Sequence, residues 1–566
     1  MKNWIFTSKV IFLAFLFSFC AKNTSAQFTR YVIKFKDKTG TPFSISNPSQ
    51  FLSPRAVERR TKQHILIDVS DLPIVPRYID SVRLSGNVKV LNSSKWLNQV
   101  CIETSDAAAL AKINSFSFVE KSDPVKKISN RGVFQKSKFA EEFKGTLSPA
   151  SPAGVNDFYN YGNAFGQIHI HEGEYLHNKG FHGEGMVISV IDAGFYHYQS
   201  LPAFDSINQN HQVIETFDFV DNKVNVNEEY FHGMSVLSIM AGNIPGQLVG
   251  TAPKAKFLLY RSEDVYTESP VEEQNWAAAA ERSDSAGADI ITTSLGYSTF
   301  DNPIFNHTYA DMNGHTTIIA RAATIAARKG MILLVAAGNE GTSSWHYITT
   351  PADTDSILTV GAVDVNGNVG NFSSYGPSSD GRIKPTIASV GVATFVSTPS
   401  GAIAAGNGTS YATPNVAGLV TCLWQAFPEF TSNEIMAAVI KSSSKYKTPD
   451  NRIGYGIPDF KVAYEDLLKQ QTLRNITLIL GSDDIKVFPN PFGKKFSVVM
   501  KTNSENSLIF QLSGSDGKIY LKKNISIIPS SNQLIEFNEL PALSKGVYFL
   551  KIGDGKKYKT QKLIVN

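Results

Sequence analysis

Residues 406–427 read GNGTSYATPNVAGLVTCLWQAF, a glycine-rich turn followed by an apolar helical stretch. The glycines let the backbone turn tightly and bring Ser410 to the start of a helix predicted over residues 416–427, with Pro414 in its first turn. Backbone N–H groups at a helix start favour negative charge that develops nearby. The alternative is a serine that only caps the helix, which is common. A cap, however, requires neither the glycines nor the proline.

Short, nearly continuous apolar runs recur between residues 161 and 468, and helical stretches lie between them. Continuous apolarity is typical of strands that are buried on both faces of a parallel sheet. The intervening helices are typical of the crossover connections in an α/β fold. The predicted strands are residues 186–191, 256–260, 289–293, 331–336 and 357–363, and the predicted helices are residues 232–242, 271–286 and 316–328. In such sheets, functional groups gather at the carboxyl ends of the strands.

Polar residues follow two of the predicted strands. Asp192 comes directly after residues 186–191 and is followed by Ala193-Gly194, a place where a carboxylate can be a fixed acceptor. Asn339 is bracketed by glycines after residues 331–336, and its amide can donate to an oxyanion. Each residue has an ordinary alternative as a turn former.

His232 opens the helix that is predicted over residues 232–242. The positive end of the helix dipole disfavours a charged imidazole, and a general base must be neutral. For this residue alone, a surface histidine near a helix cap is the commoner explanation. Its significance therefore depends on the other segments.

Together, these segments resemble the signatures of the subtilisin-like serine peptidases, or subtilases, in the family's order of Asp, His, oxyanion Asn and Ser. The resemblance covers roughly residues 160–465. The Ser segment, Gly408-Thr409-Ser410 followed by Ala412-Thr413-Pro414, is highly specific, and the Asn segment is nearly as specific. The Asp segment reads Asp-Ala-Gly where most members have Asp-Ser-Gly or Asp-Thr-Gly, a departure that leaves the carboxylate in place.

The resemblance implies a catalytic triad of Asp192, His232 and Ser410. Ser410 would attack the peptide carbonyl, and His232 would take its proton and later pass it to the leaving amine. Asp192 would fix the tautomer of the imidazole and stabilise the imidazolium. Asn339 would donate to the oxyanion together with a backbone N–H near Ser410.

The resemblance also implies a substrate-binding edge. Ser294-Leu295-Gly296 is similar to the segment with which subtilases pair the main chain of an extended peptide by strand addition. Glu340 follows the oxyanion Asn and is either near the pocket for the residue before the scissile bond or a solvated loop carboxylate. Neither interpretation of Glu340 is preferred.

No cofactor is required by this mechanism, although many subtilases hold a structural calcium ion. Asp218, Asp221 and Asn222 offer oxygen ligands, but their spacing matches no calcium loop. A solvated loop is therefore the preferred interpretation, and no metal ligand is predicted.

Residues 27–128 are predicted to form a small α+β module, because short strands and helices alternate there. The predicted strands are residues 31–35, 88–91, 98–103 and 118–120, and the predicted helices are residues 75–84 and 107–113. The module resembles a subtilase propeptide, and FLSPRAVERR at residues 51–60 is similar to bacterial relatives. This resemblance implies a chaperone and inhibitor that occupies the cleft until it is cleaved. Residues 129–160 are predicted to be a linker that contains the processing region.

Residues 482–566 are predicted to form a small all-β sandwich. The predicted strands are residues 495–500, 508–512, 534–537 and 547–552, with turn signals at Asp516-Gly517 and Asp554-Gly555. The region resembles the C-terminal sorting domain of type IX secretion through VFPNPF at 487–492, Gly546-Val547-Tyr548 and KLIV at 562–565. This implies the type IX secretion machinery as a partner. The alternative is a generic β-sandwich that binds a surface or a carbohydrate.

The first 26 residues are predicted to be an export signal. Lys2 and Lys9 flank a short apolar run over residues 10–19, and Thr24-Ser25-Ala26 offers a cleavage site before Gln27. The run is shorter than the ~20 apolar residues that span a bilayer. A buried N-terminal helix is the alternative. The signal and the sorting domain predict a secreted or cell-surface protein of a Gram-negative bacterium, exported through the periplasm.

Charge and cysteine content narrow the function further. With 54 basic and 50 acidic residues the net charge is only +4, which argues against a nucleic-acid partner. Cys20 leaves with the signal, and Cys101 and Cys422 lie in separate predicted domains, so no disulfide is expected. The sequence predicts a secreted serine endopeptidase made as a zymogen, whose partners are protein or peptide substrates and its own propeptide.

Two other functions are weighed against this prediction. A non-catalytic surface-binding protein could retain the subtilase fold, but it would not need all of Asp192, His232, Asn339 and Ser410. A serine esterase would usually carry a Gly-x-Ser-x-Gly elbow, which does not surround Ser410. The expected fold class is α/β, a subtilisin-like parallel sheet with flanking helices, together with the α+β propeptide and the C-terminal all-β sandwich.

Overall fold

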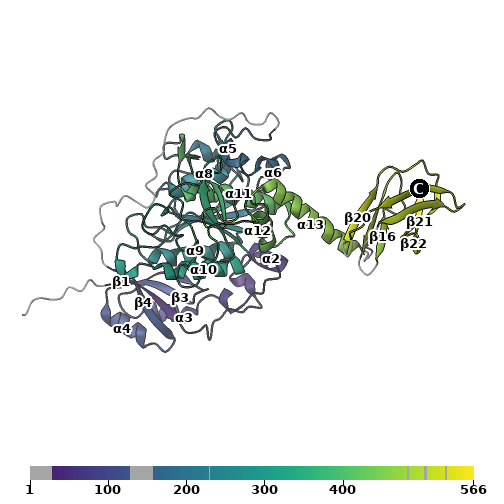
Figure 1. Cartoon of the computed structure of the whole chain (residues 1–566). Coiled ribbons are helices and arrows are strands. Elements are labelled where there is room, and N and C mark those ends of the chain that lie inside the picture. Colours follow the sequence, from purple (N-terminus) through teal and green to yellow (C-terminus); the bar gives the residue numbers. More distant parts are fainter. Residues whose placement is uncertain are drawn as a thin grey trace, which may run out of the picture. The chain divides into compact units, whose positions relative to one another are not determined.

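The computed structural model describes residues 28–127, 157–228, 230–480, 484–501, 507–528 and 532–565, and Figure 1 shows their course. The predicted export signal (residues 1–26) and residues 129–156 of the predicted linker lie outside the described residues. The chain divides into two compact units, Met1–Ala463 and Tyr464–Asn566. No helix in the described ranges combines the length and apolarity needed to cross a membrane.

A seven-stranded sheet lies at the centre of the first unit, and all its strand pairs are parallel. Its strand order is β13-β12-β11-β10-β5-β9-β6. The strands are β5 (Val187–Asp192), β6 (Val213–Asp218), β9 (Lys256–Arg261), β10 (Ile290–Thr293), β11 (Ile332–Ala336), β12 (Leu358–Val363) and β13 (Ile387–Val390). Every residue of β5, β10, β11 and β12 is buried, which explains their continuous apolar runs. The α/β prediction is confirmed.

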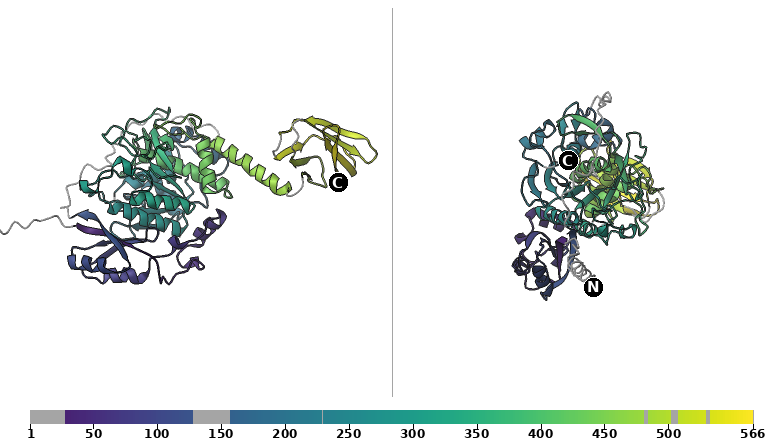
Figure 2. Two further views of the ribbon diagram at one scale, coloured as in Figure 1. Left: turned by 60° about the horizontal axis from the view of Figure 1, so that its bottom comes forward. Right: turned by 90° about the vertical axis from the view of Figure 1, so that its left-hand side faces the viewer.

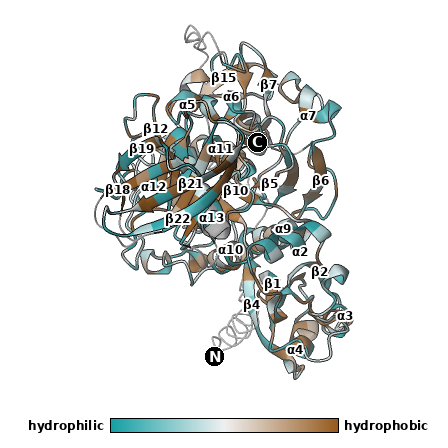
Figure 3. Cartoon of the chain, turned by 90° about the vertical axis from the view of Figure 1, so that its right-hand side faces the viewer, coloured by the Kyte–Doolittle hydropathy of each residue, from teal (hydrophilic) through white to brown (hydrophobic). Residues whose placement is uncertain are grey.

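Long helices cover both faces of this sheet (Figure 1). Helices α9 (Val271–Ala286) and α10 (Ile318–Arg328) pack together on one face. Helices α8 (His232–Ala241) and α11 (Thr409–Ala426) pack together on the other. Figure 3 colours the central strands and α11 mostly as hydrophobic. The sheet and its helices therefore form one layered core.

Shorter elements complete the first unit after residue 157. The helices are α5 (Phe165–His169), α6 (Glu174–Asn178), α7 (Asp205–Gln209) and α12 (Ser432–Lys441), with single turns η3 (Pro202–Phe204), η4 (Pro303–Phe305) and η5 (Tyr309–Asp311). Two small hairpins pair β7 (Asn243–Ile244) with β8 (Leu248–Val249), and β14 (Thr394–Ser397) with β15 (Ile403–Gly406). Helix α13 (Phe460–Leu480) runs through the boundary predicted at residue 468.

The N-terminal module of residues 28–127 is an antiparallel sheet in the order β2-β3-β1-β4. Its elements are β1 (Phe28–Phe35), β2 (Lys89–Ser94), β3 (Gln99–Glu103), β4 (Val119–Lys127), α2 (Pro54–Lys62), α3 (Pro76–Arg83), α4 (Ala107–Ser115), η1 (Pro48–Gln50) and η2 (Val69–Asp71). One face of the sheet forms a core with α3 and α4. The other face packs against α9, where Val32, Cys101 and Val125 meet Val271. Figure 2 shows the module, in purple, against the helices of the larger sheet.

The α+β prediction is confirmed, but helix α2 was not predicted. Its start follows ordinary capping rules, because the side chain of Ser53 accepts a hydrogen bond from the Ala56 N–H and Pro54 occupies the first helical position. Three basic residues, Arg59, Arg60 and Lys62, stand in its last turn, where they suit the helix dipole.

The second unit contains two antiparallel sheets, β16-β17-β20 and β19-β18-β21-β22. The strands are β16 (Ile485–Phe488), β17 (Phe496–Lys501), β18 (Leu508–Gly514), β19 (Ile519–Ile525), β20 (Asn532–Phe537), β21 (Gly546–Gly553) and β22 (Tyr558–Val565). Their inward side chains form one apolar core, which confirms the all-β prediction. Strands β16, β19 and β22 were not predicted as strands. Most residues of β19 and β22 are exposed, so these two strands lack a clear apolar pattern.

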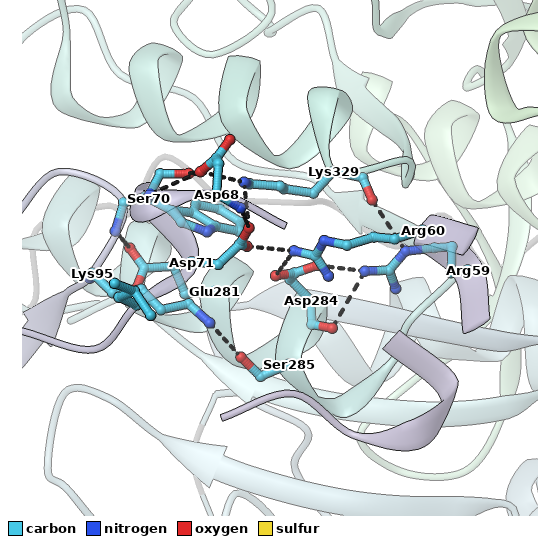
Figure 4. Close-up of polar contacts among 12 residues, drawn as sticks. Arg59, Arg60, Asp68, Ser70, Asp71, Lys95, Glu281, Asp284, Ser285 and Lys329 are labelled. Carbon is cyan, nitrogen blue, oxygen red and sulfur yellow. Dashed lines mark hydrogen bonds and ion pairs between the residues drawn. The ribbon is translucent and has the colours of Figure 1, made fainter. Parts of the chain in front are cut away.

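Glu281 of α9 ties the N-terminal module to the larger domain (Figure 4). Its carboxylate accepts hydrogen bonds from the side chain of Ser94 and from the backbone N–H groups of Lys95 (2.7 Å) and Trp96 (3.1 Å). Burial raises the pKa of Glu281 to about 7, against the opposing effect of Lys95. Solvent would return the pKa towards 4.5 if the module left.

Binding of the N-terminal module should therefore take up a proton at Glu281 and weaken as pH rises. Because the pKa is raised in the bound state, this contribution is complete below pH 4.5 and is lost as pH rises through about 7. The measurement is the fraction of module that stays bound at pH 5 and pH 8 after the chain is cut between residues 128 and 157. Glu281→Gln should remove this part of the pH dependence. Identical profiles for the two proteins would contradict the assignment.

Candidate active site

Asp192 and His232 form a buried pair at the carboxyl end of the central sheet. Asp192 is the last residue of β5, and His232 is the first residue of α8. Asp192 Oδ1 lies 2.6 Å from His232 Nδ1, and neither side chain has exposed surface. Because an ionised carboxylate can only accept, Nδ1 is the donor and the basic lone pair of a neutral imidazole falls on Nε2. The Ala193 N–H also donates to Oδ1, at 2.7 Å.

Gly233 permits this close approach of helix to strand. A Cβ atom at this position would lie 2.6 Å from the Gly194 carbonyl oxygen and 2.8 Å from the Cβ of Asp192. Both distances are shorter than side chains tolerate. The sequence interpretation gave Gly233 no role, because the clash exists only in the folded chain.

Ser410 is the second residue of α11 and is almost fully buried. The prediction for this helix was wrong at its start: α11 begins at Thr409, and Pro414 is its sixth residue. Proline has no N–H to donate to the carbonyl four residues earlier, which is that of Ser410. The Ser294 hydroxyl donates to this carbonyl instead, at 2.8 Å. The helix therefore continues through the proline.

The start of α11 lies beside the Asp192–His232 pair. Helices α8 and α11 pack against each other, and the rings of His232 and Tyr411 have centroids 6.4 Å apart. The Ser410 hydroxyl lies 3.4 Å from the Ser294 carbonyl oxygen. The structure thus brings Asp192, His232 and the Ser410 turn together from three separate segments.

Asn339 follows β11 and is exposed. Its Oδ1 accepts hydrogen bonds from the backbone N–H (2.9 Å) and the hydroxyl (3.0 Å) of Thr409. Because a backbone N–H can only donate, the amide oxygen is the atom that contacts Thr409, and Nδ2 is the atom of the amide that can donate elsewhere. This positioning role of Thr409, the neighbour of Ser410, was not predicted from the sequence.

Ser294, Leu295 and Gly296 follow β10, and the side chains of Ser294 and Leu295 are buried. A Cβ atom on Gly296 would overlap Thr349 Oγ1, and one on Gly338 would lie 3.0 Å from the same atom. Thr349 thus fills the space between the segment that ends at Gly296 and the turn before Asn339. No sequence signal marks Thr349, since both glycine segments are distant from it along the chain.

The Glu340 main chain is held by its own loop and by the segment that contains Ser374. Its N–H donates to the Ser374 hydroxyl at 2.9 Å, and its carbonyl accepts from the Ser343 N–H at 2.8 Å. Glu340 is half-buried, and its nearness to a substrate pocket stays a prediction.

The acidic residues that were weighed as calcium ligands belong to an ion-pair network. Arg261 Nη1 lies 2.8 Å from Asp218 and 3.1 Å from Asp221, and Lys223 Nζ lies 3.9 Å and 3.7 Å from the same two carboxylates. Two positive charges therefore oppose the two negative ones. A different group, Glu263, Glu268 and Glu272, brings one carboxylate oxygen from each residue within 4.8 Å of the others. All-oxygen donors of this kind suit calcium. Glu263 also accepts a hydrogen bond from the Tyr297 hydroxyl.

Comparison with known proteins assigns three regions of the chain. Residues 183–456 match the subtilase family, residues 30–141 match the peptidase S8 propeptide domain of Bacteroidota, and residues 486–566 match a secretion system C-terminal sorting domain.

Several characterised relatives are proteases. A thermophilic serine proteinase of Bacillus sp. (strain AK1) is 30% identical over 304 residues, which cover 53% of this chain and 67% of the relative. Thermitase of Thermoactinomyces vulgaris is 28% identical over 273 residues, which cover 46% of this chain and 82% of thermitase. Serine protease AprX of Bacillus subtilis (strain 168) is 27% identical over 303 residues, which cover 48% of this chain and 64% of AprX.

A solved structure, MycP1 from the ESX-1 type VII secretion system, is also similar, with 22% identity and a TM-score of 0.43 over 58% of this chain and 92% of that one. The sequence matches at the family level are the stronger result, because they include both the peptidase and its propeptide. The chain belongs to the subtilase family of serine endopeptidases and carries a propeptide domain and a C-terminal sorting domain.

Proposed function

We propose that Asp192, His232 and Ser410 are the catalytic triad of this endopeptidase. The observation that supports it best is the buried 2.6 Å contact of Asp192 with His232, beside the helix start that carries Ser410. Ser410 attacks the substrate carbonyl while His232 Nε2 accepts its proton, and His232 then protonates the leaving amine. Asp192 holds the imidazole and stabilises the imidazolium, while itself remaining ionised.

Asn339 stabilises the oxyanion in this proposal. The negative oxygen forms near the first turn of α11, where backbone N–H groups and the helix dipole favour it. Thr409 fixes the oxygen of the Asn339 amide, so Nδ2 is the group available to a substrate. Such a donor accelerates the reaction because it is in position before charge develops.

An extended peptide pairs with the main chain of Ser294-Leu295-Gly296 by strand addition. Glu340 borders the pocket for the residue before the scissile bond. Thr349, behind Gly296, limits the depth of that pocket. No step uses a cofactor, and the group of Glu263, Glu268 and Glu272 has the donor chemistry for a structural calcium ion.

The remaining regions serve folding and export. Residues 1–26 are the export signal, 27–128 the propeptide, 129–160 the linker that is processed, 161–468 the peptidase domain and 482–566 the sorting domain. The propeptide acts as a chaperone and keeps the precursor inactive, and the linker is the segment that is cut during maturation. The type IX machinery reads the sorting domain and delivers the protein from the periplasm to the cell surface or the medium of a Gram-negative bacterium.

Ser410→Ala should abolish peptidase activity and labelling by a fluorophosphonate probe, because both require the nucleophilic hydroxyl. The matched control is Ser400→Ala, which removes an exposed hydroxyl from a nearby turn. Mass spectrometry of the labelled peptide provides the direct readout. Probe attachment to a different serine would overturn the triad assignment and leave a binding protein or another active site to be considered.

Asn339→Ala should lower kcat by about 10²–10³, the loss known for such a donor in subtilisin, with a much smaller change in KM. The reason is that the amide contacts the oxyanion and not the ground-state substrate. Steady-state kinetics on a peptide substrate measures both constants. An unchanged kcat would remove Asn339 from the site.

Ser294→Ala should destabilise the protein by about 1–3 kcal/mol, because the buried carbonyl of Ser410 loses its donor. It should also lower kcat, since the turn that holds Ser410 is no longer fixed. Adding Pro414→Ala restores an N–H that can donate to the same carbonyl, so the double variant should regain stability. Denaturant unfolding measures the effect. Equal stability of the single and double variants would contradict this account.

Deletion of residues 482–566 should leave an active peptidase, because none of the proposed catalytic residues lies there. In a cell that uses type IX secretion, the truncated protein should stay in the periplasm. Fractionation and immunoblotting locate it, with the full-length chain as the control. Normal amounts of truncated protein at the cell surface or in the medium would exclude the sorting role and favour a surface- or carbohydrate-binding sandwich.

A further inference from the structure

The propeptide inserts two arginines into the peptidase domain far from the proposed catalytic residues. Arg59 and Arg60 of helix α2 are 5% and 1% exposed, and both reach Asp284 near the end of α9 (Figure 4). Asp284 precedes β10, whereas the proposed substrate edge at Ser294 follows it. In a parallel sheet, the residues before a strand and the residues after it lie at opposite ends of the strands. The contact is therefore separate from the catalytic cleft.

The binding groups come from the carboxyl ends of two helices. Arg59 pairs with Asp284 Oδ1 and donates to the carbonyls of Ala288, just after α9, and of Lys329 (3.3 Å), just after α10. Arg60 lies 2.8 Å from Asp284 Oδ2. Carbonyls at helix ends lack intrahelical donors, and the helix dipole there attracts cations. A forked guanidinium suits such a mixed set of oxygens.

The two helix ends are shaped for this approach. Gly287 and Gly330 follow α9 and α10 with φ of 93° and 87°, in the left-handed region. A Cβ on Gly287 would lie 2.7 Å from the Cβ of Arg55, and one on Gly330 would lie 2.7 Å from Ile65 Cδ1. Side chains at these positions would push α2 and the segment after it away.

The charges in this interface are shared between the two domains. Asp71 of the propeptide accepts from Arg60 at 2.7 Å and from Lys329 at 2.9 Å. Burial opposes ionisation of Asp284, but Arg59 and Arg60 outweigh it and hold the pKa of Asp284 below its ordinary value. Removing both arginines would leave the buried carboxylate of Asp284 without either of its compensating charges, which is costly.

We propose that Asp284, with the carbonyls of Ala288 and Lys329, is a binding socket for paired guanidinium groups that holds the propeptide independently of the catalytic cleft. Cutting the linker then does not release the propeptide. Release requires that Arg59 and Arg60 leave the socket. This proposal rests on the proposed function only where it calls the propeptide an inhibitor. The contact itself does not depend on which residues are catalytic.

The test uses the full chain with Ser410→Ala and a site for a sequence-specific protease inserted between residues 128 and 157. After cleavage and dilution, gel filtration and biolayer interferometry measure how long the propeptide stays bound. Arg59→Ala/Arg60→Ala should weaken binding by about 100-fold or more, the size expected when a buried pair is broken. The matched control is Arg77→Ala/Arg83→Ala, which removes the same charge from exposed positions on α3.

Two further variants separate recognition from folding. Arg59→Lys/Arg60→Lys keeps both charges but removes the forked donors, and it should also bind more weakly. Asp284→Asn removes the negative charge and one of the two acceptor oxygens on the other side of the contact, and its effect should be non-additive with that of the arginine variant. Thermal unfolding of each uncut chain checks that it folds. Retention of the Arg59→Ala/Arg60→Ala propeptide equal to that of the α3 control, or strict additivity with Asp284→Asn, would overturn the proposal. The readout is binding, so a failed triad assignment would leave it unaffected.

Discussion

The buried contact between Asp192 and His232 is the constraint on which the site depends. Two ionisable side chains with no exposed surface are held 2.6 Å apart, although 40 residues separate them along the chain. Burial of either alone would be costly, and the hydrogen bond compensates that cost while fixing the imidazole. The contact requires the end of β5 to lie against the start of α8. This close approach is possible because Gly233 has no side chain.

The helix that carries Ser410 is also held at the carboxyl ends of the central strands. Pro414 would normally leave a carbonyl without a donor, and the carbonyl concerned is that of Ser410 itself. The hydroxyl of Ser294 satisfies it from the end of β10. The segment with the proposed substrate-pairing role therefore also holds the proposed nucleophile in place, and Thr409 links the same turn to Asn339.

The two ends of the central strands have different roles. The carboxyl ends of the strands carry the proposed chemistry. The helix ends that lie beside the amino ends of the strands bind the propeptide. Helix α9 serves the second role along its length, through Val271 near its start, Glu281 in its last turns and Asp284 near its end. A propeptide held in this way has several contacts that do not depend on the cleft.

Local sequence patterns predicted the fold class and the buried central strands, and short motifs that resemble those of subtilases indicated the proposed catalytic residues. Those features follow from local patterns: continuous apolar runs, helix periodicity and short motifs at strand ends. Two strands were missed, β6 and β13, and they lie at the two edges of the sheet. Strand β6 is partly exposed and lacks such a run, and β13 is a short buried segment of four residues. The folded chain was needed to find the start of α11, the contacts of Ser294 and Thr349, and the socket for Arg59 and Arg60. These depend on contacts between residues far apart in the chain, 116 residues in the case of Ser294 and Ser410, and no local pattern encodes which distant groups will meet.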